Sequence, residues 1–376
     1  MSDQLYFDIF KDPEGGVGET KAPGEFIKAE LEKRGWSQAD FAQILSRPLP
    51  TVNEIIKGKR GITPEMAVAL GSAFNQPAEI WIHREAAYRL AQVQSAPDKE
   101  TVIKASLFSE APVKEMQKRG WISSSKQSAE ILKEELEGFW VENIKAVARK
   151  SGDDEFSNAQ MAWLCRASRL SESLNVRTFS KDKLVTALPK LRTLAGLPER
   201  VAHLPVYLAE LGVRLVVVEA LPRTRIDGAA FYLENNKSAP VIALSLRIDR
   251  MESVWHTIGH ELFHIVHGDP LSLDSDLVGK EPNHKSCDLE ERADKNSTNW
   301  LISEKEMASF VRRAGPKFGK ASIIQFANRI GIHPSIIVGQ LHHRGKLAWS
   351  QRNELCPKIK EHFFETALVD GHGYKI

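Results

Sequence analysis

Two histidines spaced four residues apart carry the clearest chemical signal in this sequence. They lie in the segment His260-Glu261-Leu262-Phe263-His264, which has the pattern H-E-x-x-H. Residues four apart share one face of a helix, so both imidazoles can bind one metal ion. The glutamate beside them can take a proton from water at that ion. The pattern predicts a zinc-dependent hydrolase with His260 and His264 as ligands and Glu261 as general base. The alternative is an amphipathic helix with two polar histidines.

A catalytic zinc site needs a third protein ligand and one open position. The segment Glu290-Glu291-Arg292-Ala293-Asp294 has a helical pattern, and Glu290 lies 26 positions after His264. That gap is long enough to bring a second helix back antiparallel to the first. Ala293 allows the two helices to approach closely, and Asp294 can hydrogen-bond a ligand imidazole. We therefore expect Glu290 to be the third ligand; the alternative is an exposed acid at a helix N-terminus.

Other histidines lie near the motif. His256 and His267 are each about one helical turn from a predicted ligand, and helix geometry favours supporting roles as orienting groups or transition-state donors over direct binding. His284 and Cys287 also have metal-like spacing, and a thiolate there could block the open zinc position. A plain loop thiol is the simpler interpretation.

A small α+β domain is expected to position these groups. β-Branched runs predict strands at 213–218, 228–233 and 240–246, followed at once by the motif helix over 251–267. A further helix is expected over 290–301. Because the third strand leads into the motif helix, we expect it to pair with an extended substrate, which favours a peptide over a small molecule.

The N-terminal region has a different pattern. Apolar residues at helical spacing, interrupted by Gly and Pro, predict about five short helices in one bundle. Helix Gln38–Leu45, a tight turn and helix Pro48–Lys57 form a predicted helix-turn-helix, whose second helix would enter the DNA major groove. We expect base contacts from Gln38, Thr51 and Asn53, and phosphate contacts from Arg47, Lys57, Lys59 and Arg60. The alternative is a bundle that contacts only protein.

Composition sets the frame for both regions. The formal net charge of +2 is nearly neutral, so any nucleic-acid contact must come from a local patch. Three cysteines without a spacing framework indicate a reducing compartment. No secretory signal or membrane-spanning run is apparent, so we expect a cytoplasmic protein without membrane contact. We divide the chain into a flexible tail (1–22), a helix-turn-helix domain (23–95), a helical connector or dimerisation layer (96–200) and an α+β domain (201–376).

Two families resemble parts of this sequence. Trp36-Ser37-Gln38-Ala39-Asp40-Phe41-Ala42 and the run from Thr51 to Ala67 resemble the lambda-repressor-like (XRE) domains of HigA-type antitoxins. Asp227-Gly228-Ala229-Ala230-Phe231, the following strand and the two motif helices resemble the ImmA/IrrE metallopeptidases, which have a zincin-like fold. The chain departs from the first family at Pro48-Leu49-Pro50 and from the second at Asn296-Ser297-Thr298-Asn299.

The resemblance implies a prokaryotic or phage regulator that binds operator DNA as a homodimer. It also implies a zinc peptidase domain in which His260, Glu261, His264 and Glu290 have the roles given above. Relatives of the second family cleave repressors or act in stress and toxin–antitoxin control.

We therefore expect a multi-domain transcription regulator fused to a zinc-dependent endopeptidase that cuts a regulatory partner or itself. One alternative is a non-catalytic HigA-like antitoxin and autorepressor, whose zinc domain senses a ligand or binds a cognate toxin. Another is a peptidase whose N-terminal bundle only recruits protein.

Overall fold

The computed structural model describes residues 21–93, 98–123, 128–142, 156–275 and 288–374. The chain divides into two compact units, Met1–Lys99 and Glu100–Ile376. The expected flexible tail lies almost wholly outside the described residues, as do His284 and Cys287.

Within its described residues, the first unit holds five short helices, as predicted. They are α2 (Pro23–Arg34), α3 (Gln38–Ile44), α4 (Leu49–Ile56), α5 (Pro64–Phe74) and α6 (Ala78–Gln92). One apolar core joins them, built around buried side chains such as Phe41, Ile55, Phe74 and Trp81. Aromatic stacking adds to this core, because the Phe41 and Phe74 ring centroids lie 5.0 Å apart.

Local sequence signals set the helix boundaries in this unit. The Asp40 N–H donates to Ser37 Oγ at 3.1 Å, and the Ser37 N–H donates to the Asp40 carboxylate at 2.9 Å, which makes a capping box at the start of α3. Gly35 ends α2 with a φ of 66°. Pro48 precedes α4, and Pro50 lies in its first turn, where a missing N–H costs nothing. The unusual proline pair is therefore compatible with a helix here.

The second unit contains a five-stranded mixed sheet. Its strands are β1 (Arg214–Val218), β2 (Ile226–Tyr232), β3 (Pro240–Leu244), β4 (Ser272–Ser275) and β5 (Leu368–Asp370). Their order across the sheet is β4-β2-β3-β1-β5. Strand β1 runs parallel to β3 and β5, whereas β2 runs antiparallel to β3 and β4. The three predicted strands are present, and β4 and β5 were not predicted.

The position of β3 overturns one sequence-based expectation. The predicted strand 240–246 was expected to accept a substrate peptide, which requires an open edge. Strand β3 is instead central, since it pairs with β2 on one side and with β1 on the other. Its ladder hydrogen bonds are used on both sides, so strand addition to β3 is not possible.

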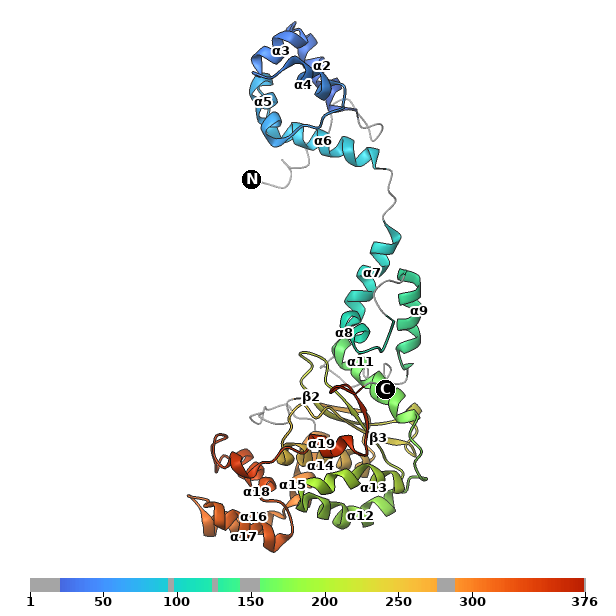
Figure 1. The fold of residues 1–376 in the computed structure, drawn as a ribbon, viewed down its shortest axis with the longest axis vertical. Helices are drawn as coiled ribbons and strands as arrows, with labels where there is room; N and C mark the ends of the chain where they lie inside the picture. The colour runs from blue at the N-terminus through green and yellow to red at the C-terminus, as the bar shows by residue number, and fades with distance from the viewer. Residues whose placement is uncertain (1–20, 94–97, 124–127, 143–155, 276–287, 375–376) are drawn as a thin grey trace. The chain divides into compact units, whose positions relative to one another are not determined.

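Helices cover both faces of the sheet (Figure 1). The α-helices in the described part of the unit are α7 (Lys99–Glu110), α8 (Val113–Lys118), α9 (Ala129–Phe139), α11 (Asn158–Glu172), α12 (Lys181–Thr193), α13 (Leu204–Glu210), α14 (Met251–His267), α15 (Asp288–Leu301), α16 (Glu304–Ala314), α17 (Lys320–Ile330), α18 (Pro334–His343) and α19 (Lys360–Phe364). Short 3-10 helices are η1 (Leu194–Gly196), η2 (Pro198–His203), η3 (Leu233–Asn235) and η4 (Asn353–Leu355).

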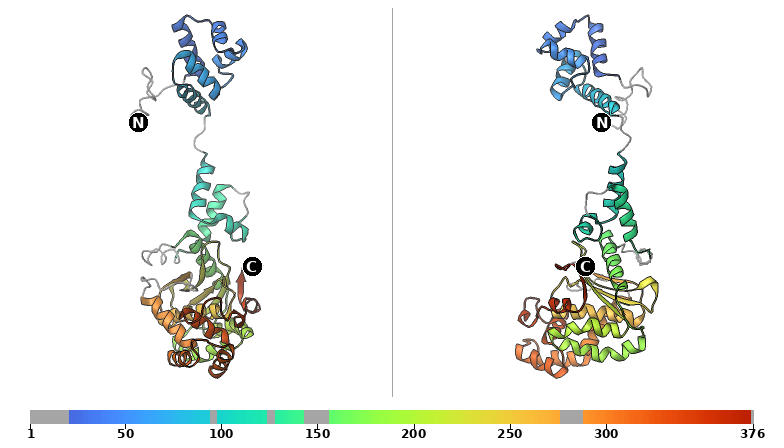
Figure 2. Two further views of the ribbon diagram at one scale, coloured as in Figure 1. Left: turned by 90° about the vertical axis from the view of Figure 1, so that its left-hand side faces the viewer. Right: turned by 45° about the vertical axis from the view of Figure 1, so that its right-hand side comes forward.

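Alternating strand residues separate the two cores. Leu215 and Val217 of β1 pack with α14 on one face, whereas Val216 and Val218 pack with α11 on the other. Figure 2 shows the helices α12–α18 gathered on the α14 side of the sheet. Because successive side chains of a strand point to opposite faces of the sheet, β1 contributes to both cores. Helix α14 packs against β2 and β3 on its face of the sheet.

The stretch 96–200, expected as a connector, is built into the second unit beyond residue 99. The Trp163 indole of α11 donates to the Val218 carbonyl at 2.8 Å. Arg192 of α12 donates to the Leu301 carbonyl at 2.8 Å and to the Ile330 carbonyl at 3.1 Å. These contacts connect α11 to the sheet and α12 to α15 and α17. None of the helices in the described part of the chain is long and apolar enough to cross a membrane.

Candidate metal centre and helix-turn-helix surface

Helix α14 carries the H-E-x-x-H motif through the middle of the second unit. Its side chains are buried along almost its whole length, and His260, Glu261 and His264 are at most 1% exposed. Gly268, with a φ of 73°, ends the helix directly after His267. The prediction of a helix over 251–267 is confirmed to the residue.

Helix α15 crosses α14 closely enough to bring Glu290 to the two histidines. Ala293 of α15 is fully buried. A Cβ atom on Gly259 would lie 2.3 Å from Ser297 Oγ, so a larger residue at this position would force the Ser297 side chain to move. Ser297 belongs to the polar stretch 296–299 of α15, and its small side chain is fully buried.

Three potential ligand atoms converge at this crossing. The Nε2 atoms of His260 and His264 are 2.9 Å apart, and the Glu290 Oε2 atom lies 3.0 Å from the first and 3.6 Å from the second. All three lie within 4.8 Å of one another. The structure thus brings together the three residues that the sequence analysis named as metal ligands.

Each histidine presents its other ring nitrogen to a carboxylate. His260 Nδ1 lies 2.7 Å from Asp294 Oδ1, and His264 Nδ1 lies 3.0 Å from Asp269 Oδ2. Because a carboxylate accepts, Nδ1 carries the proton in both rings, and the Nε2 lone pairs face Glu290. Asp294 has the orienting position that the sequence predicted, whereas Asp269 was missed.

The donor set fits a zinc ion. Bonds of about 2.0–2.2 Å place neighbouring ligand atoms of a tetrahedron roughly 3.3–3.6 Å apart, close to the distances found here. Two nitrogen lone pairs and a carboxylate repel one another unless a cation lies among them. A cation among these atoms would also keep the Glu290 carboxyl ionised, as a ligand must be.

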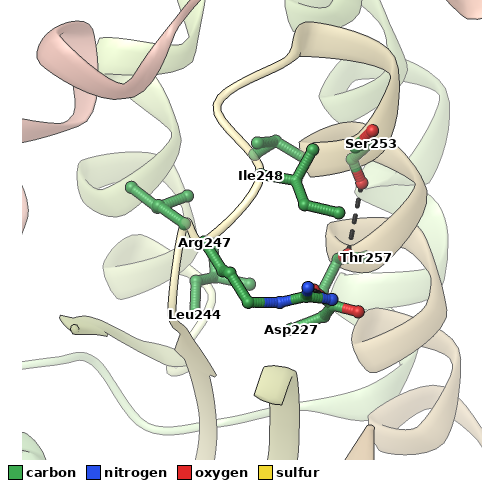
Figure 3. A pocket seen from close by; sticks show the side chains of 8 residues that line it. Asp227, Leu244, Arg247, Ile248, Ser253 and Thr257 are labelled. Atoms are coloured by element: carbon green, nitrogen blue, oxygen red, sulfur yellow. Dashed lines mark hydrogen bonds and ion pairs between the residues drawn. The ribbon is translucent and has the colours of Figure 1, made fainter. Parts of the chain in front are cut away.

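Glu261 lies under β2. A Cβ atom on Gly228 would lie 2.5 Å from Glu261 Oε1 and 2.7 Å from Thr257 Cγ2, so the absence of a side chain at residue 228 makes room for the carboxylate. The neighbouring Asp227 forms an ion pair with Arg247 at 2.9 Å. Asp227, Arg247 and Thr257 line a cavity of about 10 Å³ (Figure 3). That volume holds about one water molecule.

The remaining predicted groups lie around the three ligands. His256 Nε2 lies 3.8 Å from Asp294 Oδ1, so this ring is close to the orienting carboxylate. His267 Nε2 instead lies 2.8 Å from the Asn296 side-chain nitrogen, which acts as its donor. The sequence analysis also missed Ser272, whose hydroxyl donates to Glu290 Oε1 at 3.1 Å from strand β4.

The first unit presents the predicted helix-turn-helix on helices α3 and α4. Val52, Ile55 and Ile56 of α4 are buried, as the periodicity predicted. The tight turn between the helices includes Ser46 in a left-handed conformation (φ 51°). The predicted DNA contacts are partly or fully exposed, and they are Gln38, Arg47, Thr51, Asn53, Lys57, Lys59 and Arg60.

Charge on this surface is concentrated after α4. Arg60 lies 3.5 Å from both the Thr51 hydroxyl and the Glu54 carboxylate, which holds it against the exposed side of the helix. Lys57 and Lys59 lie exposed beside it. One acid therefore faces a cluster of basic side chains.

Comparison with known proteins identifies this first unit. Residues 27–81 match the helix-turn-helix family. Virulence-associated protein A' of Dichelobacter nodosus is 39% identical over 83 residues, which are 22% of this chain and 72% of that protein. An Escherichia coli (strain K12) protein described as an uncharacterized HTH-type transcriptional regulator, YddM, is 28% identical over 20% of this chain and 81% of its own length.

A solved structure, Pseudomonas aeruginosa antitoxin HigA with the higBA promoter, is 31% identical and covers 21% of this chain and 99% of its own, with a TM-score of 0.20. Through its N-terminal domain, this chain belongs to the helix-turn-helix family.

Proposed function

We propose that this protein is a DNA-binding transcription regulator of the antitoxin type, fused to a zinc-dependent endopeptidase. The first unit binds operator DNA, and the second cleaves a regulatory partner protein or the chain itself. The protein acts in the cytoplasm, and as a homodimer it reads two half-sites of one operator.

Membership of the helix-turn-helix family supports the DNA-binding half of the proposal. Helix α4 has a buried apolar side and an outward side that carries Thr51 and Asn53. Hydroxyl and amide side chains suit contacts with base edges. The basic residues Lys57, Lys59 and Arg60 suit phosphate contacts, which set the register of the helix in the groove.

The convergence of His260, His264 and Glu290 is the single observation that carries the peptidase half. Each histidine is oriented by a carboxylate, an arrangement that fixes the tautomer required for metal binding. A zinc ion bound there would supply Lewis acidity toward a substrate carbonyl. The two nitrogens and one carboxylate oxygen form the ligand set of many zinc peptidases.

Glu261 is the group that moves the proton in this proposal. It lies next to the ligand His260, in the space that Gly228 leaves under β2. Its carboxylate takes a proton from the attacking water and passes it to the leaving amine nitrogen. Burial excludes bulk water and strengthens its electrostatic interactions with the reacting atoms.

Strand β4 replaces β3 as the docking edge for a peptide. Among the strands of the described residues, it is the outermost on the side of β2, and its Ser272 hydroxyl donates to the ligand Glu290. An extended peptide added antiparallel or parallel to this edge passes next to the three ligands. A peptide substrate thus agrees with the sheet order, although the strand differs from the one expected.

A second candidate is favoured by the complete burial of Glu261. In that case, the zinc domain binds a toxin or senses a ligand without cutting anything. The experiment that separates the two candidates compares wild type with Glu261→Gln for zinc content, operator binding and cleavage of co-expressed partner proteins. We expect the variant to keep zinc and operator binding and to lose all cleavage. Zinc-loaded wild type whose cleavage pattern matches that of the variant would establish the second candidate instead.

A further inference from the structure

His264 is held by a carboxylate that lies outside both sequence motifs. Asp269 Oδ2 lies 3.0 Å from His264 Nδ1, and the Asp269 side chain is almost completely buried. The backbone fixes this pair, because the Asp269 N–H donates to the His264 carbonyl at 3.0 Å directly after Gly268 ends helix α14. The same helix terminus therefore positions the ligand and its orienting acid together.

The second oxygen of Asp269 binds a residue of α15. Arg292 Nη2 donates to Asp269 Oδ1 at 2.5 Å. A buried carboxylate is costly unless it is paired, and a guanidinium supplies both a charge and a donor. Each oxygen of Asp269 thus has one partner, and the two partners come from different helices.

Helix α15 consequently acts on both histidines as well as supplying a ligand. Its Glu290 points at the two Nε2 atoms, and its Asp294 orients His260 directly. Arg292 reaches His264 indirectly, through Asp269. The Asp294 side chain is 49% exposed, whereas the Asp269 side chain is 7% exposed. The carboxylate that orients His264 is therefore more buried than the one that orients His260.

We propose that Asp269 and Arg292 are positioning residues of the metal site. Asp269 holds the proton on Nδ1 of His264 and aims its Nε2 atom, while Arg292 anchors Asp269. Zinc affinity therefore depends on the docking of α15 through a salt bridge as well as through Glu290. This inference rests on the proposed zinc site but does not require that the site cut a peptide.

The test measures zinc affinity of the full chain by competition with a chromophoric chelator. Loss of an orienting partner typically weakens metal binding on the order of 10- to 100-fold, and we expect that loss for Asp269→Asn. Arg292→Gln should show a smaller loss, because Asp269 keeps its contact with His264. Arg292→Lys should recover much of it, since only one nitrogen of the guanidinium makes the contact.

The exposed Arg344–Glu304 pair provides matched controls. Arg344 donates to both carboxylate oxygens of Glu304 at 2.9 and 2.5 Å, on the surface of the same unit. Arg344→Gln and Glu304→Gln remove the same chemical groups and should leave zinc affinity unchanged. Absorption of the cobalt-substituted proteins reports the ligand geometry separately and should change only in the Asp269 and Arg292 variants.

The zinc affinities separate failure of the zinc site from failure of the positioning role. Wild type that binds no zinc would refute the zinc site itself. Wild type that binds zinc, with Asp269→Asn and Arg292→Gln as tight as the controls, would overturn only the positioning role. If Asp269→Asn does not fold, the Arg292→Gln and Arg292→Lys pair decides, and equal affinities of both with wild type would overturn the inference.

Discussion

The two units of this chain place their candidate functional residues in opposite environments. In the first unit, the side chains of Arg47, Lys57 and Arg60 are exposed, and none of them belongs to the apolar core. In the second unit, His260 and His264 are buried and are held by residues from another helix and a helix terminus. A surface of charges tolerates small shifts, whereas a metal site requires each atom within a few tenths of an ångström.

Substitutions at different kinds of position should therefore damage the two functions. The DNA-binding surface depends on the stability of its bundle and on the number of its charges. The metal centre depends on close packing at Gly228 and Gly259 and on the carboxylates behind the histidines. Substitutions that damage one unit should therefore leave the other unchanged.

The largest expected effect comes from the core of the first unit. Phe41→Ala removes a fully buried ring that stacks on Phe74, and such truncations cost about 3–5 kcal/mol. Thermal unfolding should show the first unit strongly destabilised and operator binding lost, with zinc affinity unchanged. Val68→Ala, at a position that is 59% exposed, serves as the control. A parallel loss of zinc affinity in Phe41→Ala would show that the two units are coupled.

The next effect breaks the second unit without touching a ligand. Gly228→Ala puts a methyl group 2.5 Å from Glu261 Oε1, so the carboxylate must shift. Displacement of a catalytic group by about 1 Å costs on the order of 100-fold in rate. We expect that loss in a peptidase assay, while zinc affinity is kept. Gly138→Ala, where an added Cβ meets nothing within 4 Å, should behave as wild type. Full activity in Gly228→Ala would argue against Glu261 as the base.

A smaller effect is expected at the capping box of α3. Ser37→Ala removes the hydroxyl that accepts from the Asp40 N–H, and loss of such a cap costs about 1 kcal/mol. Chemical denaturation of the first unit should report this loss. Ser72→Ala, within helix α5, removes a hydroxyl that only donates to the Val68 carbonyl, and it should change stability less. Equal effects of the two variants would mean that the cap contributes nothing.

The smallest effect concerns single charges on the DNA-binding surface. Lys57→Gln should weaken binding about equally for all DNA sequences and reduce the salt dependence of affinity by about one phosphate contact. Asn53→Ala should instead relax the preference for one base position. Lys28→Gln, an exposed lysine on α2, is the control. Salt dependence that is the same in Lys57→Gln and wild type would remove Lys57 from the interface.

Short-range patterns explain most of what could be predicted from the sequence. His260 and His264, and likewise Glu290 and Asp294, are four residues apart on single helices, so each pair shares a face whatever the rest of the fold does. The capping residues Ser37 and Asp40 are also local. The arrangement within each of these three pairs follows from helix geometry alone.

Long-range pairing explains what could not be predicted. Strand β1 pairs beside β3 and makes it central, and no local pattern in 240–246 encodes that neighbour. Strand β4 is four residues long and β5 three, too short for a clear alternation. Asp269 meets Arg292 only because α15 docks on α14, so this ion pair could not be predicted from the residues around either partner.

We infer that His260, His264 and Glu290 bind one zinc ion. The zinc content and zinc affinity of the purified full chain test this site in wild type, Glu290→Gln and the neighbouring control Glu291→Gln. We predict one zinc per chain in wild type and in Glu291→Gln. The loss of an orienting partner weakens zinc binding by up to roughly 100-fold. Because Glu290→Gln removes a ligand itself, we expect its zinc affinity to fall by more than that. A wild-type chain without zinc, or a Glu290→Gln variant that binds as tightly as wild type, would contradict the account.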